Sequence, residues 1–316
     1  MAIPANSLQT FQSTNNAENV TDIVMNISPI DTPLLTMAKK TTAEATFTQW
    51  PIESLSAVDT NNANIEGDDA AIDVSSTPTL VGNFTQLMDK TASVTTTQEA
   101  IKKYGVSKEM AKQMAKKSKE LKRDMETTAF LNQARVVGAA GTAQKMRSLP
   151  SWITTNVSRG VGGVSGSATT AATDGTQRNF TEALFRQLIV TTITNADELP
   201  NTVMAGPANR ANLSTQLSGN STRFYELKDG QLNASISVYR SDYGPLKLVM
   251  NRFMRERDMF LINPEYIGIR TLEPMQSQDL AVTGLTKKKQ LWTNWTLEVS
   301  NEAAHGVLAD LNTVVI

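Results

Sequence analysis

The 316-residue sequence predicts an α+β fold arranged around one long helix. Residues 107–135 place apolar side chains at helical spacing. Segments 45–51 and 289–311 alternate polar and apolar residues, which is typical of strands, and 79–88 is a further extended segment. Residues 177–260 combine a helical pattern with further strands, which indicates a separate α/β unit. The length is sufficient for two such units.

Composition and charge exclude several classes of function. The chain has no cysteine, which rules out disulfides, thiolate nucleophiles and zinc–sulfur sites. A single histidine, His305, rules out clusters of imidazole ligands. The net charge is −1, so any binding of nucleic acid must come from local segregation of charge. Neither a secretory signal nor the ~20 apolar residues of a membrane span is present, so we expect a soluble protein without membrane contact.

Polar and weakly periodic residues precede the first strand. Residues 1–30 have the pattern of an arm that becomes ordered only against another surface. A short amphipathic helix is predicted to begin at Pro33, because proline is tolerated in a first helical turn. The strands 45–51 and 79–88 are expected to pair with each other.

The segment between these two strands is acidic throughout. It contains six acidic residues and no Lys or Arg: Glu53, Asp59, Glu66, Asp68, Asp69 and Asp73. A connection of this length without secondary structure is uncommon inside a compact domain. We therefore expect a projecting two-stranded ribbon with an acidic tip. Three of these carboxylates offer oxygen ligands for Ca²⁺ or Mg²⁺, but they lack the spacing of a calcium loop. A solvated acidic tip is therefore favoured over a metal site.

The long helix has a narrow apolar stripe and a cationic opposite face. Ser107 is expected to cap its first turn by accepting a backbone hydrogen bond. The apolar stripe consists of Met110, Met114, Leu121, Met125 and Thr128. The cationic face consists of Lys108, Lys112, Lys116, Lys119 and Arg123. Such a rod, roughly 40 Å long, is expected along the edge of a core, with its cations facing solvent or an anionic partner.

Four elements are predicted in the middle of the chain. After a glycine-rich segment at 159–176, expected to be a flexible loop, an amphipathic helix is predicted at 179–196. A buried strand at 201–206 leads to a helix that begins at Pro207. A hairpin is predicted at 234–253. The glycine-rich segment is not followed by Gly-Lys-Ser/Thr, so a phosphate cradle is not indicated.

The C-terminal part is expected to return to the sheet beneath the long helix. Two strands interrupted at Pro264 precede the alternating segment at 289–311. Within this segment, His305 is expected at a strand end without a serine nucleophile motif, which favours a structural hydrogen bond over catalysis. We therefore predict no catalytic residue, no cofactor and no metal site.

Three segments carry a resemblance to a known family. TPLLTMAKK, SKEMAKQMAKKSKELKRDME and TLEVSNEAAHGV, with the order of parts around them, resemble the major capsid proteins of tailed bacteriophages, which have the Hong Kong 97-type fold. The resemblance spans essentially the whole chain. It implies an N-arm (1–30), a short helix (31–43), an extended loop (44–96), a peripheral domain (97–176 with 261–316) and an axial domain (177–260).

The resemblance also implies a function. A capsid protein of this type self-assembles into hexamers and pentamers of an icosahedral head that encloses double-stranded DNA. Its expected partners are itself, a portal, a scaffolding protein, a decoration protein and the packaged DNA, contacted without sequence specificity. Its expected location is the virion, after assembly in the bacterial host cytoplasm. The acidic loop would lie on a neighbouring copy, and the basic helix face would meet either another copy or DNA.

A second class of protein remains open from the residues alone. The basic helix suits a nucleic-acid-binding protein whose affinity falls steeply with salt. Against this class, the helix offers no aromatic residues for stacking on bases, and the net charge is −1.

Overall fold

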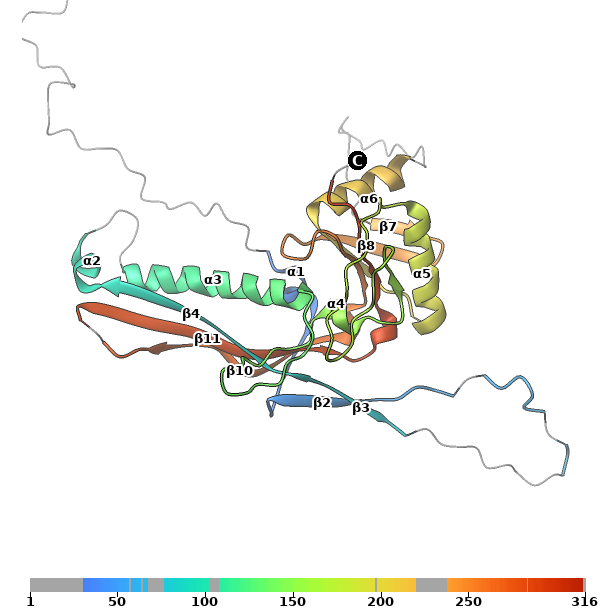
Figure 1. Ribbon diagram of the computed structural model, residues 1–316, viewed down its shortest axis with the longest axis horizontal. Coiled ribbons are helices and arrows are strands. Elements are labelled where there is room, and N and C mark those ends of the chain that lie inside the picture. Colours follow the sequence, from blue (N-terminus) through green and yellow to red (C-terminus); the bar gives the residue numbers. More distant parts are fainter. Residues whose placement is uncertain are drawn as a thin grey trace, which may run out of the picture.

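An elongated arm joins a thicker body in the computed structural model of the chain (Figure 1). The structure describes residues 31–56, 58–63, 65–67, 77–102, 108–196, 198–219, 238–282 and 284–314. The predicted N-arm, the predicted cap Ser107 and three of the acidic loop residues, Asp68, Asp69 and Asp73, lie outside these ranges.

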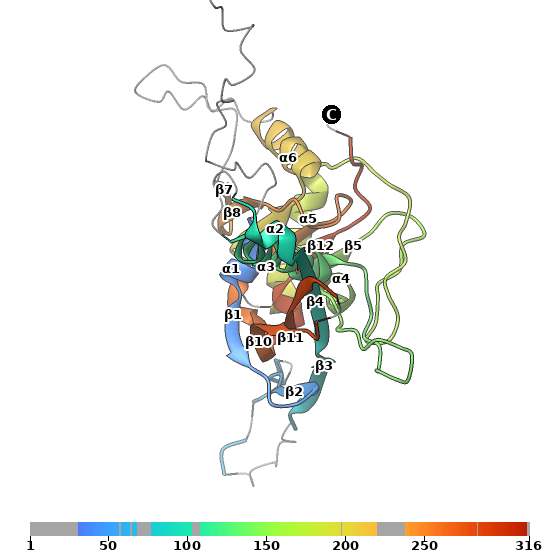
Figure 2. The same ribbon diagram turned by 90° about the vertical axis from the view of Figure 1, so that its left-hand side faces the viewer.

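A four-stranded sheet forms one layer of the elongated arm. Its strands, in spatial order, are β1 (Lys39–Thr42), β10 (Ile267–Asp279), β11 (Thr286–Val299) and β4 (Gln86–Thr95). β1 runs parallel to β10, and the other neighbours are antiparallel. Helix α3 (Glu109–Phe130) lies along one face of this sheet, over β4 and β11 (Figures 1 and 2). The C-terminal strand therefore returns beneath the long helix, as predicted.

The apolar stripe of α3 faces the sheet as its spacing predicted. Met110 packs against Ala92 and Val94, which alternate with exposed residues along β4. Leu121 is fully buried, and Met125 enters the larger core that also holds Trp295. Met114 is half-buried against the same cluster as Met110.

The helix is shorter than the predicted 107–135, because its ends are set by distant residues. At its start, the carboxylate of Glu99 accepts the backbone N–H groups of Glu109 (3.1 Å) and Met110 (3.2 Å). Glu99 belongs to the short helix α2 (Thr96–Ala100) and satisfies donors that the helix leaves unpaired. At its end, Leu131 adopts an extended backbone, and the side chain of Asn132 bonds to the main chain of Ala172 instead.

A six-stranded sheet forms the centre of the body. Its strands, in spatial order, are β5 (Val157–Ser158), β12 (Gly306–Leu308), β9 (Met259–Ile262), β6 (Thr202–Ala205), β8 (Gly244–Met250) and β7 (Val238–Ser241). Helices α5 (Glu182–Ala196) and α6 (Pro207–Gly219) belong to the same body. The predicted helix, buried strand and hairpin of the middle block are thus confirmed. The sheet also recruits β5 and β12 from outside residues 177–260, since a buried sheet edge needs hydrogen-bond partners.

The remaining described helices are short. They are α1 (Pro33–Met37), α4 (Leu149–Trp152) and two 3-10 turns, η2 (Pro264–Tyr266) and η3 (Glu302–Ala304). The predicted first helix stops at Met37, because Lys39 and Lys40 join β1 and pair with Gly268 and Ile269 of β10.

The glycine-rich segment 159–176 is not the flexible loop that its composition predicted. The buried carboxylate of Asp310 accepts the backbone N–H groups of Gly160 (3.0 Å) and Gly175 (2.9 Å). Arg257 pairs with the same carboxylate at 2.7 Å. A Cβ at Gly160 would stand 2.0 Å from the carbonyl oxygen of Thr176, so the segment needs glycine to close on Asp310.

Candidate assembly surfaces

A two-stranded ribbon projects from the body. Strands β2 (Phe47–Ile52) and β3 (Thr79–Phe84) pair antiparallel, from Phe47 opposite Phe84 to Ile52 opposite Thr79. This confirms the predicted pairing. Within the described residues, the two strands form a sheet only with each other.

The base of the ribbon is fixed to the body by buried side chains. The indole of Trp50 donates to the carbonyl of Val299 at 3.1 Å. The amide of Asn83 donates to the carbonyls of Arg147 (3.0 Å) and Leu297 (2.9 Å) and accepts the N–H of Arg147 (2.7 Å). The ribbon therefore leaves the body from a rigid base.

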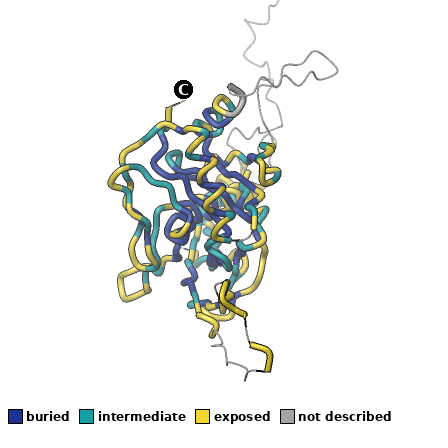
Figure 3. The backbone as a smooth tube through the Cα atoms, turned by 90° about the vertical axis from the view of Figure 1, so that its right-hand side faces the viewer, coloured by how far each residue is buried: buried dark blue, intermediate teal, exposed yellow. Residues whose placement is uncertain are grey.

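Beyond this base the described residues, 53–56, 58–63, 65–67 and 77–80, are exposed (Figure 3). Glu53, Asp59 and Glu66 lie there with exposed side chains, and Asp59 accepts the N–H of Asn61 at 2.8 Å. Two apolar side chains are almost completely exposed as well: Leu55 at 98% and Val58 at 91%. Only the carboxylates of this segment were predicted to matter for contacts between copies. The apolar residues between them were the missed signal.

The cationic face of α3 points away from the sheet. Lys108, Lys116 and Lys119 are exposed, while Lys112 and Arg123 are half-buried. None of the four lysines forms an ion pair with a described residue. Arg123 lies over the ring of Phe253 at 5.2 Å, an attractive contact that adds no opposite charge.

Two acidic residues of α3 pair with lysines that are not part of this cationic face. Glu120 pairs with Lys117 at 2.8 Å, and this hydrogen bond lowers the pKa of Glu120. Asp124 pairs with Lys90 of β4 at 2.6 Å, and this bond raises the pKa of Lys90. The five predicted cations consequently form a stripe of positive charge along α3.

The acidic ribbon and the basic stripe do not meet within one copy. The ribbon extends from one end of the molecule, while α3 runs toward the opposite end (Figure 1). Any pairing of these two surfaces therefore requires a second copy.

His305 has the structural role that was predicted. It is fully buried, and its Nδ1 accepts the backbone N–H of Asn263 at 3.2 Å. Burial lowers the pKa of His305 to about 3, so the imidazole is neutral at pH 7.

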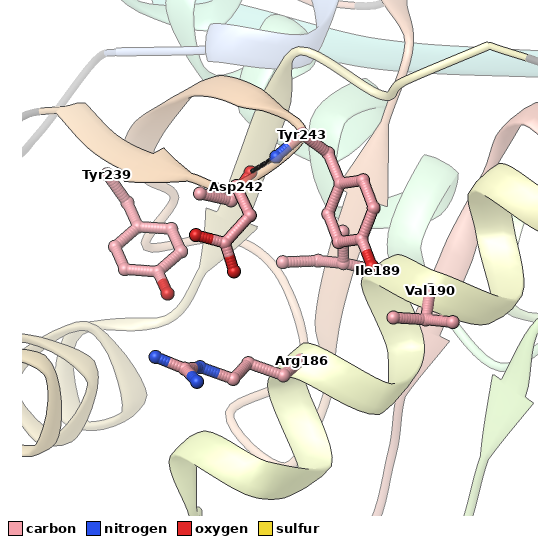
Figure 4. A pocket seen from close by; sticks show the side chains of 7 residues that line it. Arg186, Ile189, Val190, Tyr239, Asp242 and Tyr243 are labelled. Atoms are coloured by element: carbon pink, nitrogen blue, oxygen red, sulfur yellow. Dashed lines mark hydrogen bonds between the residues drawn. The ribbon is translucent and has the colours of Figure 1, made fainter.

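A hollow of about 100 Å³ lies between α5 and the β7–β8 hairpin (Figure 4). Arg186, Tyr239, Asp242 and Tyr243 point into it. Arg186 pairs with Glu182 at 2.8 Å, and its hydrogen bond to Tyr239 raises its pKa. The hollow is smaller than ordinary ligand pockets, which are about 300–1,000 Å³.

The described part of the chain contains neither a cluster of metal ligands nor a membrane-spanning helix. There, no three His, Asp or Glu side chains gather as metal ligands. None of the helices described has both the length and the hydropathy that crossing a bilayer requires.

The arm with its spine helix, the α/β body and the projecting ribbon together define a shell protein of the Hong Kong 97 type, the class that the sequence predicted. The capsid asymmetric unit of cyanophage A-1(L) has this fold, with a TM-score of 0.65 and 13% identity over 96% of this chain and 99% of that chain. The major capsid and decoration proteins of phage G give a TM-score of 0.55 at 6% identity, over 98% of this chain and 99% of that chain.

The chain belongs to the SU10 major capsid protein family, whose sequence model matches residues 5–312. It is also similar to the major capsid protein of Escherichia phage Phieco32, with 38% identity over 110 residues. That match spans 34% of this chain and 31% of the relative. Members of this family are structural capsid proteins, so the alternative of a nucleic-acid-binding protein acting through its basic helix is not favoured.

Proposed function

We propose that this chain self-assembles into the hexamers and pentamers of an icosahedral phage head that encloses double-stranded DNA. The observation that carries the proposal is the ribbon: a rigid base holds a segment that exposes large apolar side chains and carboxylates to solvent. Such a segment is unfavourable in a single soluble copy, because exposed leucine and valine side chains lower their free energy when they are buried. Contacts between copies would bury this segment of the ribbon.

The chain divides into parts with separate roles in this proposal. Residues 97–176 with 261–316 form the peripheral domain, which holds α3. Residues 177–260 form the axial domain, which gathers around the hexamer and pentamer axes. The N-arm (1–30) and the extended loop (44–96) adjust to the different contacts at the two kinds of axis.

The basic stripe of α3 faces the packaged DNA in this proposal. Its cations follow one another at intervals of four, four, three and four residues, from Lys108 to Arg123, over about 22 Å of helix. Like charges at this spacing destabilise a helix by a few tenths of a kcal/mol per pair. A polyanion next to the stripe offsets that repulsion. Phosphate contacts of this kind carry no sequence specificity.

Further partners follow from the same role. A portal and a separate scaffolding protein would direct assembly in the host cytoplasm, and a decoration protein, such as the one solved with the phage G capsid protein, would bind the outside of the head. The chain has no catalytic role in this scheme.

Sedimentation and negative-stain electron microscopy of the purified chain test the proposal. Closed shells tens of nanometres across are expected, either from the chain alone or with its scaffolding protein. Particles that stay monomeric or dimeric under both conditions would contradict it. DNA affinity without shells would favour the nucleic-acid-binding alternative.

A further inference from the structure

Arg147 is a buried cation at the base of the ribbon. Its residue is only 9% exposed, and its backbone N–H and carbonyl both bond to the side chain of Asn83. Among its guanidinium nitrogens, only Nη2 donates to a described residue, the carbonyl of Ser151. Nε is buried and has no hydrogen-bond partner there. A buried charge is costly unless an opposite charge and hydrogen-bond partners accompany it, so this guanidinium lacks what such a group needs.

A second arginine lies at the same ribbon base. Arg135 is half-buried, and its Nη1 donates to the carbonyl of Gly82 at 3.3 Å. Neither Arg135 nor Arg147 forms an ion pair with a described carboxylate. Burial and the neighbouring charge of Arg135 lower the pKa of Arg147 to about 10. The two cations therefore repel each other in the subunit.

Aromatic rings support both guanidinium groups. That of Arg147 lies over the ring of Trp152 at 4.2 Å, and that of Arg135 lies over the ring of Phe47 at 5.6 Å. Trp152 in turn contacts Trp50 of the ribbon, with ring centroids 5.7 Å apart. Stacking of this kind orients a planar guanidinium and leaves its N–H groups for an anion with several oxygens, such as a carboxylate or a phosphate.

The surrounding chain supplies no acid for this pair. Residues 127–173 contain four basic residues and neither Asp nor Glu. The carboxylate whose charge reaches Arg147 is that of Glu302. Glu302 is already engaged, because it accepts the backbone N–H groups of Thr154 and Thr155 and the hydroxyl of Thr155 at 2.7 Å. The anion that would compensate both arginines is therefore not among the described residues.

We infer that Arg135 and Arg147 together bind one small oxyanion of the phosphate or sulfate class. One such ion has enough oxygens to accept hydrogen bonds from both guanidinium groups. The small exposure of Arg147 admits a compact ion rather than a bulky phosphate ester. A free ion is favoured over a carboxylate of another copy, because the repulsion between the arginines exists in the single subunit before assembly.

Thermal unfolding of dissociated subunits at pH 7 tests the inference, with inorganic phosphate as the probe. The melting temperature should rise by roughly 2–3 °C when phosphate is about tenfold above its dissociation constant, relative to sodium chloride at equal ionic strength. Titration calorimetry should give one phosphate per subunit. Equal melting temperatures in phosphate and chloride, or several weak sites per subunit, would overturn the site.

Variants connect the response to the two arginines. Arg147→Lys keeps the charge but loses the planar fork, and Arg135→Gln removes the half-buried partner. Each should lose most of the rise in phosphate. The matched control is Lys119→Gln, which removes one exposed positive charge from α3 and should keep the full rise. If Arg147→Lys fails to fold, Arg135→Gln still decides, because a full phosphate response in that variant would contradict the inference.

The occupant of the site in shells is the last arm of the test. A carboxylate of another copy lying against Arg147 in assembled shells, with no response of dissociated subunits to phosphate, would assign the site to that copy and overturn the free ion. These measurements concern the dissociated subunit. Their failure therefore leaves the proposed assembly untouched, whereas a chain that never forms shells removes the proposed function alone.

Discussion

The carboxylate of Glu126 accepts the backbone N–H of Leu34 at 2.9 Å, which joins α3 to the first turn of α1. The N–H of Leu35 (3.0 Å) and the side-chain amide of Asn251 (2.7 Å) bind the same carboxylate. Glu126 is fully buried, and burial raises its pKa against the opposing effect of the three donors. One side chain thus connects the first described helix, the spine helix and the segment that follows β8.

Removing this carboxylate should destabilise the subunit. Glu126→Ala leaves three buried donors without an acceptor, so the free energy of unfolding should fall by about 2–4 kcal/mol. Urea denaturation of dissociated subunits measures the loss. The matched control is Glu120→Ala on the same helix, where a half-exposed pair with Lys117 is worth about 0–1 kcal/mol. Equal losses from the two variants would show that Glu126 does not hold the elements together.

His305 should make the subunit sensitive to acid. Its pKa is about 3 in the folded chain and about 6.5 when unfolded, so the unfolded chain binds a proton first as the pH falls. Its contribution to stability is complete above pH 6.5 and decreases by about 1.4 kcal/mol per pH unit as the pH falls from 6.5 toward 3. The measurement is urea denaturation at pH 7, 6 and 5.

His305→Asn is the matched variant for this prediction, because its side-chain oxygen can accept the N–H of Asn263 and does not titrate. The stability difference between the natural chain and the variant should shrink as the pH falls below 6.5. A difference that stays constant from pH 7 to pH 5 would show that His305 does not titrate with folding.

Neutralising the stripe on α3 should weaken DNA binding without unfolding the chain. The variant Lys112→Gln, Lys116→Gln, Lys119→Gln removes repulsion between neighbouring turns, so stability should stay within about 1 kcal/mol of the natural value. The slope of log affinity against log salt for duplex DNA should fall by up to about 0.9 per lysine removed.

A control with the same change of charge uses three exposed lysines outside α3: Lys39, Lys40 and Lys247. This control should retain most of the salt slope. If both triple variants lose the same slope, the binding depends on total charge and the stripe has no special role.

The ribbon should be needed for assembly and dispensable for folding. Ile52 and Thr79 are the last paired residues, so an Asn-Gly turn can replace residues 53–78 with little strain. The shortened chain should keep its circular dichroism and melting temperature but form no shells. A length-matched scramble of 53–78 separates the loss of particular side chains from the loss of length. Normal shells from the shortened chain would exclude the ribbon from assembly.

Much of this architecture was predictable because its signals are local. The stripe from Met110 to Thr128 follows from helical periodicity, and the β2–β3 pair and the β7–β8 hairpin follow from alternation and turn residues. The cationic face of α3 follows from the same helical periodicity, since a charged surface stripe needs no tertiary partner.

The features that were missed depend on partners far away in the chain. A glutamate such as Glu126 is expected at the surface from its residue type. Its role as an acceptor becomes clear only in the fold, where Leu34, 92 residues earlier, lies beside it. The glycines at 159–176 read as a flexible loop, yet Asp310 lies 150 residues from Gly160 and closes it. The carboxylate of Glu99 at the start of α3 was missed as well, because α2 brings it there, and the predicted cap Ser107 lies outside the described residues.

An electron cryomicroscopy map of the assembled particle tests the central claim most directly. The account predicts a closed shell in which each ribbon lies on the body of a neighbouring subunit, with Leu55 and Val58 buried between copies. A compact lone molecule whose ribbon folds back on its own body would contradict it.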